Sequence, residues 1–240
     1  MNDTLKIPFE GDTTVSLPNN INYTPIKYII INEGFTHLPS SLFPKFPNLQ
    51  NITLPESLET IDDGGFDFIS LIKYLFIPKG VRILSAGNPF DTGPIEYIDV
   101  DQDNPYFCSV DGILFYKDMT ILYSFPTYLN MSIYMVPNAV TRFGYGAFNR
   151  AKYLKKNYIP DSVVDLSAEF LCQNYDVIEE VIIFRYFRQN LPYIGPNSFI
   201  STTFQKSNIK YIYSVFIPKT CQICYFSLFK KDYLYVFILM

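Results

Sequence analysis

Two cysteines near the end of the chain have the spacing of a chemical site. Cys221 and Cys224 form a Cys-X-X-Cys pair within IPKTCQICYF, residues 217–226. Thiols at this spacing exchange disulfides when they open a helix after a strand, because their pKa is then lowered. The same pair can supply half of a zinc site, which requires two further cysteine or histidine ligands. No such second pair is provided by the remaining Cys108, Cys172 and His37.

Other kinds of chemical site have no better support. Asp99, Asp101 and Asp103 occupy the first, third and fifth positions of a calcium-loop pattern. The Gly and Glu that this pattern requires later are replaced by Asn104 and Val110. The single histidine lies between apolar residues, and the 11 glycines form no phosphate-binding loop. We therefore expect no catalysis, no metal and no cofactor.

The composition excludes several classes of protein. The chain has 240 residues, and its 48% hydrophobic content excludes a disordered chain. A net charge of −4 without any Lys/Arg cluster argues against a nucleic-acid partner. No signal peptide is visible at the N-terminus. The C-terminal YLYVFILM is apolar for eight residues, whereas a membrane span needs roughly 20. We expect a soluble chain without a transmembrane segment.

A repeat of 23 residues organises most of the sequence. Short apolar runs end at Pro55, Pro78, Pro137, Pro160 and Pro218. The first two prolines are 23 residues apart, as are the third and fourth, and the same step from the first pair leads to Asn32 and Asp101. We call these positions anchors. A fixed period of this length is typical of solenoid proteins, so each copy should form one turn of a continuous array.

The residues before the anchors predict strands. Apolar residues stand one, three and six positions before the first four anchors: Ile31, Ile29 and Ile26; Leu54, Ile52 and Leu49; Ile77, Leu75 and Ile72; Val100, Ile98 and Ile95. Alternate residues of a strand point to the same side, so these residues should lie in the core. The spacing LxxLxL is the opening of a leucine-rich repeat.

The residues after the anchors explain the cysteine pair. Apolar residues follow at three, six and eleven positions: Phe35, Leu38 and Phe43; Leu58, Ile61 and Phe66; Val140, Phe143 and Phe148. The same positions after Pro218 hold Cys221, Cys224 and Phe229. A buried cysteine behaves as a small hydrophobic residue with an inert thiol. We interpret the pair as core packing, not as redox or metal chemistry.

Three segments carry a fuller pattern in which the anchor proline is followed by Ser-Val or a similar pair and later by Phe. They are NITLPESLETIDDGGFDFISL (51–71), YMVPNAVTRFGYGAFNRAKYL (134–154) and NYIPDSVVDLSAEFLCQNYDVI (157–178). They resemble the BspA-like class of leucine-rich repeats, over residues 26–240. The resemblance implies a β-rich repeat solenoid, a curved array with short helical turns. It also implies a surface antigen, because such proteins are common on parasitic protists and mucosal bacteria.

An insert and two irregular ends interrupt the pattern. Residues 99–126 resemble a β-hairpin that often interrupts arrays of this family, and Asp111-Gly112 predicts its two-residue turn. We expect a degenerate N-terminal cap at 1–25 and a repeat domain at 26–240, with the hairpin insert at 102–126. The copy after Ile178 fits only with its anchor at Arg188.

The last copy ends at Met240 without the polar cap that solenoids need. This absence predicts edge-to-edge self-association at the C-terminus, or a fragment of a longer repeat protein.

The strand positions between the core residues should form the concave face, where repeat proteins bind partners. Aromatic and apolar residues are unusually frequent there, and we predict a ligand-binding stripe of Tyr28, Tyr74, Phe76, Tyr97, Met135, Tyr158 and Phe216. The alternative is that loops cover these residues, or that Tyr and Phe simply favour strands. A stripe suits an extended protein or glycan ligand better than a small molecule.

Three functions from different classes follow. The resemblance favours a non-enzymatic adhesion or host-interaction protein at the cell surface or secreted. An intracellular, cytoplasmic protein-binding scaffold has the same fold and differs only in compartment. A redox enzyme would require reactive thiols at Cys221 and Cys224.

Overall fold

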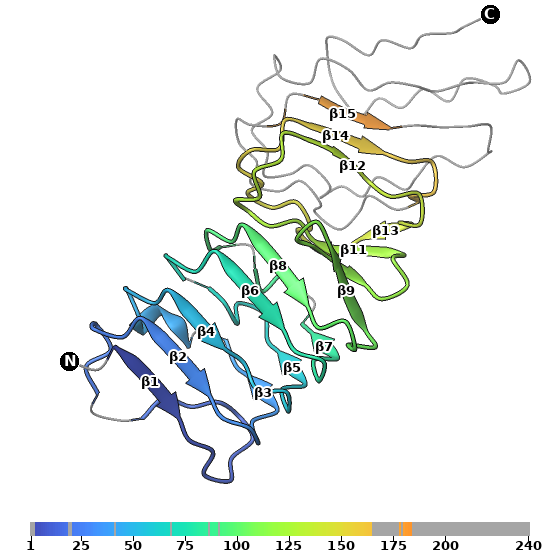
Figure 1. The fold of residues 1–240 in the computed structure, drawn as a ribbon. Coiled ribbons are helices and arrows are strands. Elements are labelled where there is room, and N and C mark those ends of the chain that lie inside the picture. The colour runs from blue at the N-terminus through green and yellow to red at the C-terminus, as the bar shows by residue number, and fades with distance from the viewer. Residues whose placement is uncertain are drawn as a thin grey trace, which may run out of the picture.

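The computed structural model describes residues 3–18, 21–40, 42–67, 69–85, 87–90, 92–164, 178 and 180–183. These residues form a succession of short strands and turns that coils along one axis into a β-solenoid (Figure 1). The single helical element among them is the 3-10 turn η1 (Phe43–Lys45). The β-rich repeat solenoid predicted from the sequence is therefore confirmed, and helical turns are a minor part of it.

One row of parallel strands runs the length of the solenoid, and we call it the long row (Figure 1). It consists of β1 (Thr4–Ile7), β2 (Tyr28–Ile31), β4 (Asn51–Thr53), β6 (Tyr74–Ile77), β8 (Tyr97–Val100), β12 (Ile133–Met135), β14 (Lys156–Ile159) and β15 (Glu180–Ile183). Tyr28 pairs with Asn51, and Tyr74 pairs with Tyr97. The 23-residue period thus sets the strand register directly.

A second row of two-residue strands returns the chain on the other side of each turn. It contains β3 (His37–Leu38), β5 (Thr60–Ile61) and β7 (Ile83–Leu84), which pair in parallel in that order. Their inward residues Leu38 and Ile61 are fully buried, as the positions six residues after the anchors predict. Each repeat therefore forms one turn of the solenoid, with a long-row strand and a return strand on either side of an apolar core.

The core between the two rows is filled by the predicted positions. Ile29, Ile52, Leu75 and Ile98 form one buried row on successive strands. Phenylalanines stack behind them, with ring centroids 5.7 Å apart for Phe43 and Phe66 and 5.5 Å apart for Phe66 and Phe90. Burying such side chains is the main favourable contribution to the stability of the array.

The serine two residues after an anchor connects neighbouring turns. The Ser57 hydroxyl donates to the Phe35 carbonyl at 2.8 Å, and the Ser162 hydroxyl donates to the Val140 carbonyl at 2.7 Å. The Glu33 carboxylate accepts from the backbone amides of Glu56 and Ser57, and the Glu56 amide is the main reason that the pKa of Glu33 is lowered. These bonds satisfy backbone groups that turns would otherwise leave unpaired.

The predicted hairpin is present. Strands β9 (Phe107–Val110) and β10 (Ile113–Tyr116) pair in antiparallel register around Asp111 and Gly112. Both turn residues have positive φ, 52° and 82°, as a two-residue hairpin turn of this type requires. Strand β11 (Ile121–Ser124) adds to β10 and then pairs in parallel with the return strand β13 (Arg142–Phe143).

The hairpin layer of β9, β10 and β11 divides the solenoid into two cores. Leu114 and Tyr123 pack in the first core, which begins at Leu5. Ile113, Phe115, Leu122 and Phe125 pack in the second core, which reaches Val181. Figure 1 shows the layer between β8 and β12, and among the described strands these two do not pair. The layer is thus apolar on both faces.

Buried polar groups connect the first half to this layer and to the turn at Gly146 beyond it. The Tyr123 hydroxyl donates to the carbonyls of Ser85 and Gly87 at 2.6 and 3.1 Å. The Asn88 amide donates to Ser124 Oγ and to the Gly146 carbonyl, both at 3.1 Å. The insert is therefore an integral part of the packing and not a surface loop.

One expectation about the ends of the array differs from the structure. Ile159 pairs with Ile183, so Ile183 takes the position just before an anchor, and the anchor expected at Arg188 is wrong. Ile178 and Val181 are buried, in agreement with this earlier register. Within the expected cap at 1–25, β1 extends the long row by pairing with β2. The division into cap and repeat domain stays a prediction.

Candidate functional site

The outward residues of β2, β4, β6 and β8 form the face that the sequence predicted as a ligand site, and we call it the outer face. Tyr28, Tyr74, Phe76 and Tyr97 are 40%, 49%, 42% and 39% exposed. Each alternates with a buried residue of the core, because neighbouring residues of a strand point to opposite sides. About two fifths to half of each of these four side chains is therefore exposed, and a binding role for them stays a prediction.

Two of the tyrosines form a stack across neighbouring strands. The rings of Tyr74 and Tyr97 lie 5.9 Å apart at an interplanar angle of 11°. Gly112 of the hairpin turn lies against the Tyr97 ring, and a Cβ on the glycine would be 2.5 Å from Cδ2 of that ring. The hairpin turn therefore contacts the stack directly.

A single carboxylate lies beside this stack. Asp99 Oδ2 accepts a hydrogen bond of 3.0 Å from the Tyr74 hydroxyl, and Oδ1 accepts one of 3.1 Å from the Ser109 hydroxyl. Partial burial and, secondarily, the bond to Asp99 raise the pKa of Tyr74. These contacts hold the tyrosine ring and the carboxylate in fixed relative positions.

The hairpin separates the predicted stripe into two patches. The Ile98 amide donates to the Gly112 carbonyl at 3.0 Å, so the hairpin turn occupies the place beside β8 that the next strand of the long row would take. We call Tyr28, Tyr74, Phe76 and Tyr97 the first patch. Beyond the hairpin, the second patch holds Ile133, Met135 and Tyr158. The continuous stripe that we expected is therefore interrupted, and Phe216 lies outside the described residues.

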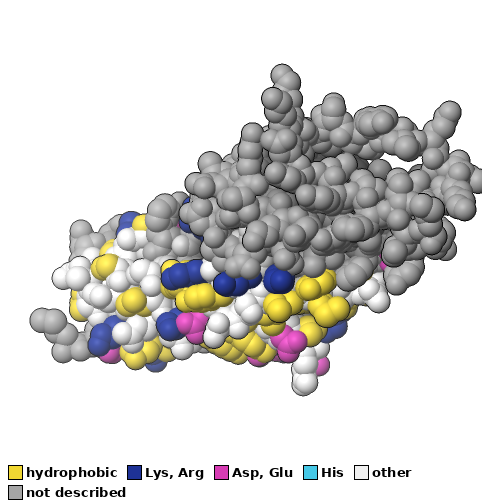
Figure 2. All heavy atoms as spheres, turned by 90° about the horizontal axis from the view of Figure 1, so that it is seen from above, with side chains coloured by type: hydrophobic (Ala, Val, Ile, Leu, Met, Phe, Trp, Pro, Cys, Tyr) yellow, Lys and Arg dark blue, Asp and Glu magenta, His cyan; other side chains and the backbone are white. Residues whose placement is uncertain are grey.

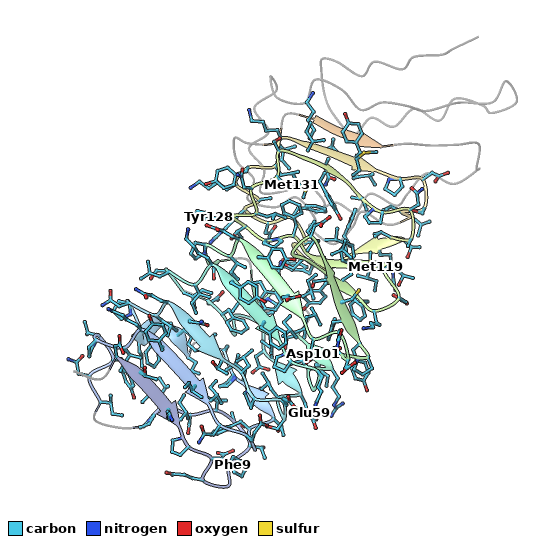
Figure 3. All side chains as sticks on the ribbon, in the orientation of Figure 1. Phe9, Glu59, Asp101, Met119, Tyr128 and Met131 are labelled. Carbon is cyan, nitrogen blue, oxygen red and sulfur yellow. The ribbon has the colours of Figure 1, made fainter. Side chains whose placement is uncertain are left out.

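The two long edges of the solenoid carry charged residues. Lys79 pairs with Glu56 at 2.6 Å and Arg82 pairs with Glu59 at 2.7 Å, each one repeat apart. Figure 3 places Glu59 and Asp101 along the edge where the strands end, and Tyr128 on the opposite edge. Lys152 Nζ lies 4.3 Å from the centroid of the Tyr128 ring.

The outer face lies between these two edges. Figure 2, which looks down on the solenoid, shows Lys and Arg side chains beside apolar ones.

The other residues considered from the sequence form no chemical centre. His37 is only partly exposed, and its Nε2 lies 2.9 Å from Asp62 Oδ2. Asp101 Oδ1 accepts from the Asp103 amide, as in an ordinary turn. The described part of the chain holds no cluster of three or more His, Cys, Asp or Glu that could bind a metal ion. Cys221 and Cys224 lie outside that part.

Sequence reasoning missed the contribution of the hairpin to the outer face. The repeat places Asp99 at an outward strand position between the core residues Ile98 and Val100. Ser109 and Gly112, by contrast, belong to the insert and follow no repeat. The period of the array carries no information about where an inserted hairpin folds back. The only sequence signal for the hairpin is Asp111-Gly112. It predicts the turn itself but not that the turn packs against Tyr97.

Comparison with known proteins agrees with this architecture. The family described as BspA type leucine rich repeat region matches residues 13–109 and 120–234, in six copies. The chain is a member of this BspA-type leucine-rich repeat family. The unmatched residues between the two ranges contain the Asp111-Gly112 turn of the insert.

Two solved structures have the same fold. The pneumococcal vaccine antigen PcpA is 27% identical with a TM-score of 0.58, over 65% of this chain and 39% of PcpA. A leucine-rich cell surface protein from Faecalibacterium prausnitzii A2-165 is 20% identical with a TM-score of 0.53, over 72% of this chain and 52% of that protein. This BspA-type chain thus covers about half or less of either relative. No curated protein matches it.

The BspA-type repeats supply a scaffold of the kind that binds other macromolecules. Among the described residues, no helix has both the length and the apolar character needed to cross a membrane.

Proposed function

We propose that this BspA-type chain is a non-enzymatic binding module of a cell-surface protein, and that its outer face holds an extended protein ligand. The observation that supports this most is the first patch. Three aromatic side chains, Tyr74, Phe76 and Tyr97, are about 40 to 50% exposed on adjacent strands. Exposed aromatic clusters on soluble proteins commonly mark interaction sites.

The geometry favours a long, flat ligand over a small one. Parallel strands lie about 4.8 Å apart, so the first patch extends across several strands of the outer face. A small molecule is normally bound in a concave pocket that buries most of its surface. Tyrosines add hydrogen-bonding hydroxyls to a large apolar area, which suits protein recognition.

Placement at the cell surface rests on the family and on PcpA, a vaccine antigen. An adhesion or host-interaction role is the form of binding that we propose for such a location. The test is an antibody against this chain applied to intact cells, in comparison with permeabilised ones. Staining that requires permeabilisation would favour the cytoplasmic scaffold instead.

The binding role is tested by a pair of substitutions in the first patch. A fluorescent form of the chain should bind cultured host cells, and Tyr74→Ala combined with Phe76→Ala should abolish that binding. Aromatic residues at the centre of an interface commonly cost about 2 kcal/mol or more when truncated. The matched control is Tyr106→Ala, because Tyr106 is 48% exposed and lies outside the outer face. Equal cell binding by the wild type and the double variant would refute the assignment of the outer face.

A further inference from the structure

We propose that the first patch recognises an arginine side chain of the extended protein ligand, with the guanidinium stacked on Phe76 and paired with Asp99. This inference rests on the proposed function and names the chemistry of the partner. Its starting point is the charge distribution of the outer face. Among the outward positions of β2, β4, β6 and β8, Asp99 is the one charged residue.

The Asp99 carboxylate retains unused capacity to accept hydrogen bonds. A carboxylate offers about four acceptor sites. Three donors reach Asp99: the Tyr74 hydroxyl, the Ser109 hydroxyl and the Val100 backbone amide. All three are neutral, and no Lys or Arg in the described ranges forms an ion pair with Asp99. Within the described part of the chain, the negative charge is therefore held in position by hydrogen bonds and has no cationic partner.

An open aromatic ring lies next to this carboxylate. Phe76 and Asp99 are direct partners in the register of β6 and β8. The Phe76 side chain is 42% exposed, and in the described part of the structure its ring stacks on no other ring. By contrast, Tyr74 and Tyr97 already stack on each other. Phe76 thus presents a partly exposed ring at the distance of one strand from a fixed carboxylate.

Arginine fits this combination better than lysine. A cation over the face of an aromatic ring is attracted by the quadrupole of the ring. The guanidinium is planar, so it can stack on a ring and still direct its N–H groups at a carboxylate in the next strand, about 4.8 Å away. A lysine ammonium is a strongly hydrated point charge that cannot stack. The two interactions together identify a basic, arginine-bearing segment as the ligand.

Matched peptides test the inference on the unaltered protein. One fluorescent peptide alternates threonine with arginine, and its counterpart replaces every arginine by citrulline, which keeps the shape and removes the charge. By fluorescence anisotropy with the full chain, the arginine peptide should bind at least about fivefold more tightly than the citrulline peptide. The difference should shrink at high salt because an exposed ion pair is screened. Equal binding, or no binding of the arginine peptide, would overturn the proposal.

Substitutions locate the effect. Asp99→Asn keeps the shape of the side chain and one acceptor oxygen while removing the charge, and it should weaken arginine-peptide binding about fivefold. Phe76→Leu keeps an apolar side chain without a ring and should weaken it about threefold. The charge control is Glu10→Gln, because Glu10 is exposed outside the outer face. An unchanged affinity of the Asp99→Asn protein would refute the site.

The two proposals fail in different ways. If Tyr74→Ala with Phe76→Ala abolishes cell binding but Asp99→Asn and citrulline change nothing, the outer face binds a ligand without an arginine contact. If the double substitution leaves cell binding intact, the proposed function itself is wrong.

Discussion

Gly80 lies so close to the backbone of the preceding turn that a Cβ at this position would be 2.1 Å from the carbonyl oxygen of Glu56. Gly80 follows Pro78 by two residues, at the position where Ser57 and Ser162 follow their own prolines. The serine copies donate a side-chain hydrogen bond to the turn before them. The glycine copy instead brings the two backbones together.

We expect Gly80→Ala to destabilise the protein by about 1–3 kcal/mol, because the methyl group overlaps backbone atoms that cannot move independently. The free energy of unfolding in urea measures this effect. Ala139 occupies the same position in the copy anchored at Pro137, so Ala139→Gly is the matched control and should cost less than about 1 kcal/mol. Equal stability of the wild type and Gly80→Ala would show that the turns are not packed this closely.

Asn157→Leu should stabilise the protein by about 1–3 kcal/mol, because a buried amide without partners costs its full desolvation energy. Asn157 is fully buried, and among the described residues neither its Nδ2 nor its Oδ1 has a hydrogen-bond partner. It occupies the core position that Leu75 holds in β6, three strands earlier in the long row. The reverse exchange, Leu75→Asn, should be strongly destabilising in the same urea assay. A loss of stability in Asn157→Leu would contradict the orphaned amide.

Tyr134→Phe should make the protein more resistant to alkaline unfolding. Burial raises the pKa of Tyr134 well above its usual range, so the folded state holds the phenolic proton more tightly than the unfolded state. The stability from this group is complete below the unfolded pKa of about 10 and is lost as the pH rises beyond it. Urea midpoints measured at rising pH should therefore fall less steeply for the variant.

Tyr123 provides the contrast for that experiment. Burial raises its pKa in the same direction, but its hydroxyl also donates to the Ser85 and Gly87 carbonyls. Unlike Tyr134→Phe, the Tyr123→Phe variant should therefore be less stable than the wild type already at neutral pH, since two carbonyls lose their hydrogen-bond donor. Identical pH profiles for the wild type and Tyr134→Phe would show that Tyr134 ionises freely in the folded protein.

The cysteines should react slowly with iodoacetamide in the folded protein. Partial burial raises the pKa of Cys108, which lowers the fraction of reactive thiolate at neutral pH. Its Sγ also lies 3.5 Å from Met119 Sδ on the hairpin. For Cys221 and Cys224, slow labelling is the expectation from their core positions in the repeat. Fast labelling of this pair, mapped by peptide mass spectrometry, would revive the redox interpretation.

The repeat explains which parts of the structure could be predicted. Core residues such as Ile29, Leu75 and Phe66 recur at fixed spacing, and periodic spacing translates directly into strand register. The hairpin turn was equally accessible, because only residues tolerant of positive φ fit it. The division into two cores could not be predicted from the sequence. Which side chains of β10 and β11 face which core depends on where the insert packs in the folded protein.

The late anchor shows a second limit. A stretched copy admits more than one alignment of apolar residues, and the sequence favoured Arg188. Pairing of Ile159 with Ile183 selects the shorter spacing, since a strand can add to β14 only in register with its hydrogen bonds. Local apolar spacing alone cannot make that choice.

The hairpin layer has a consequence for how arrays of this kind change their length. In a linear array each turn is stabilised only by its two neighbours, so melting spreads inward from the ends. A layer with one face in each core interrupts that spread. Leu114 packs in the first core and Phe115 in the second, so melting of one half leaves the other face of the layer packed. Duplication or loss of turns on one side leaves the contacts on the other side unaltered. The insert thus acts as a boundary between two parts of the solenoid, and the number of repeat turns on one side can change without changing the other.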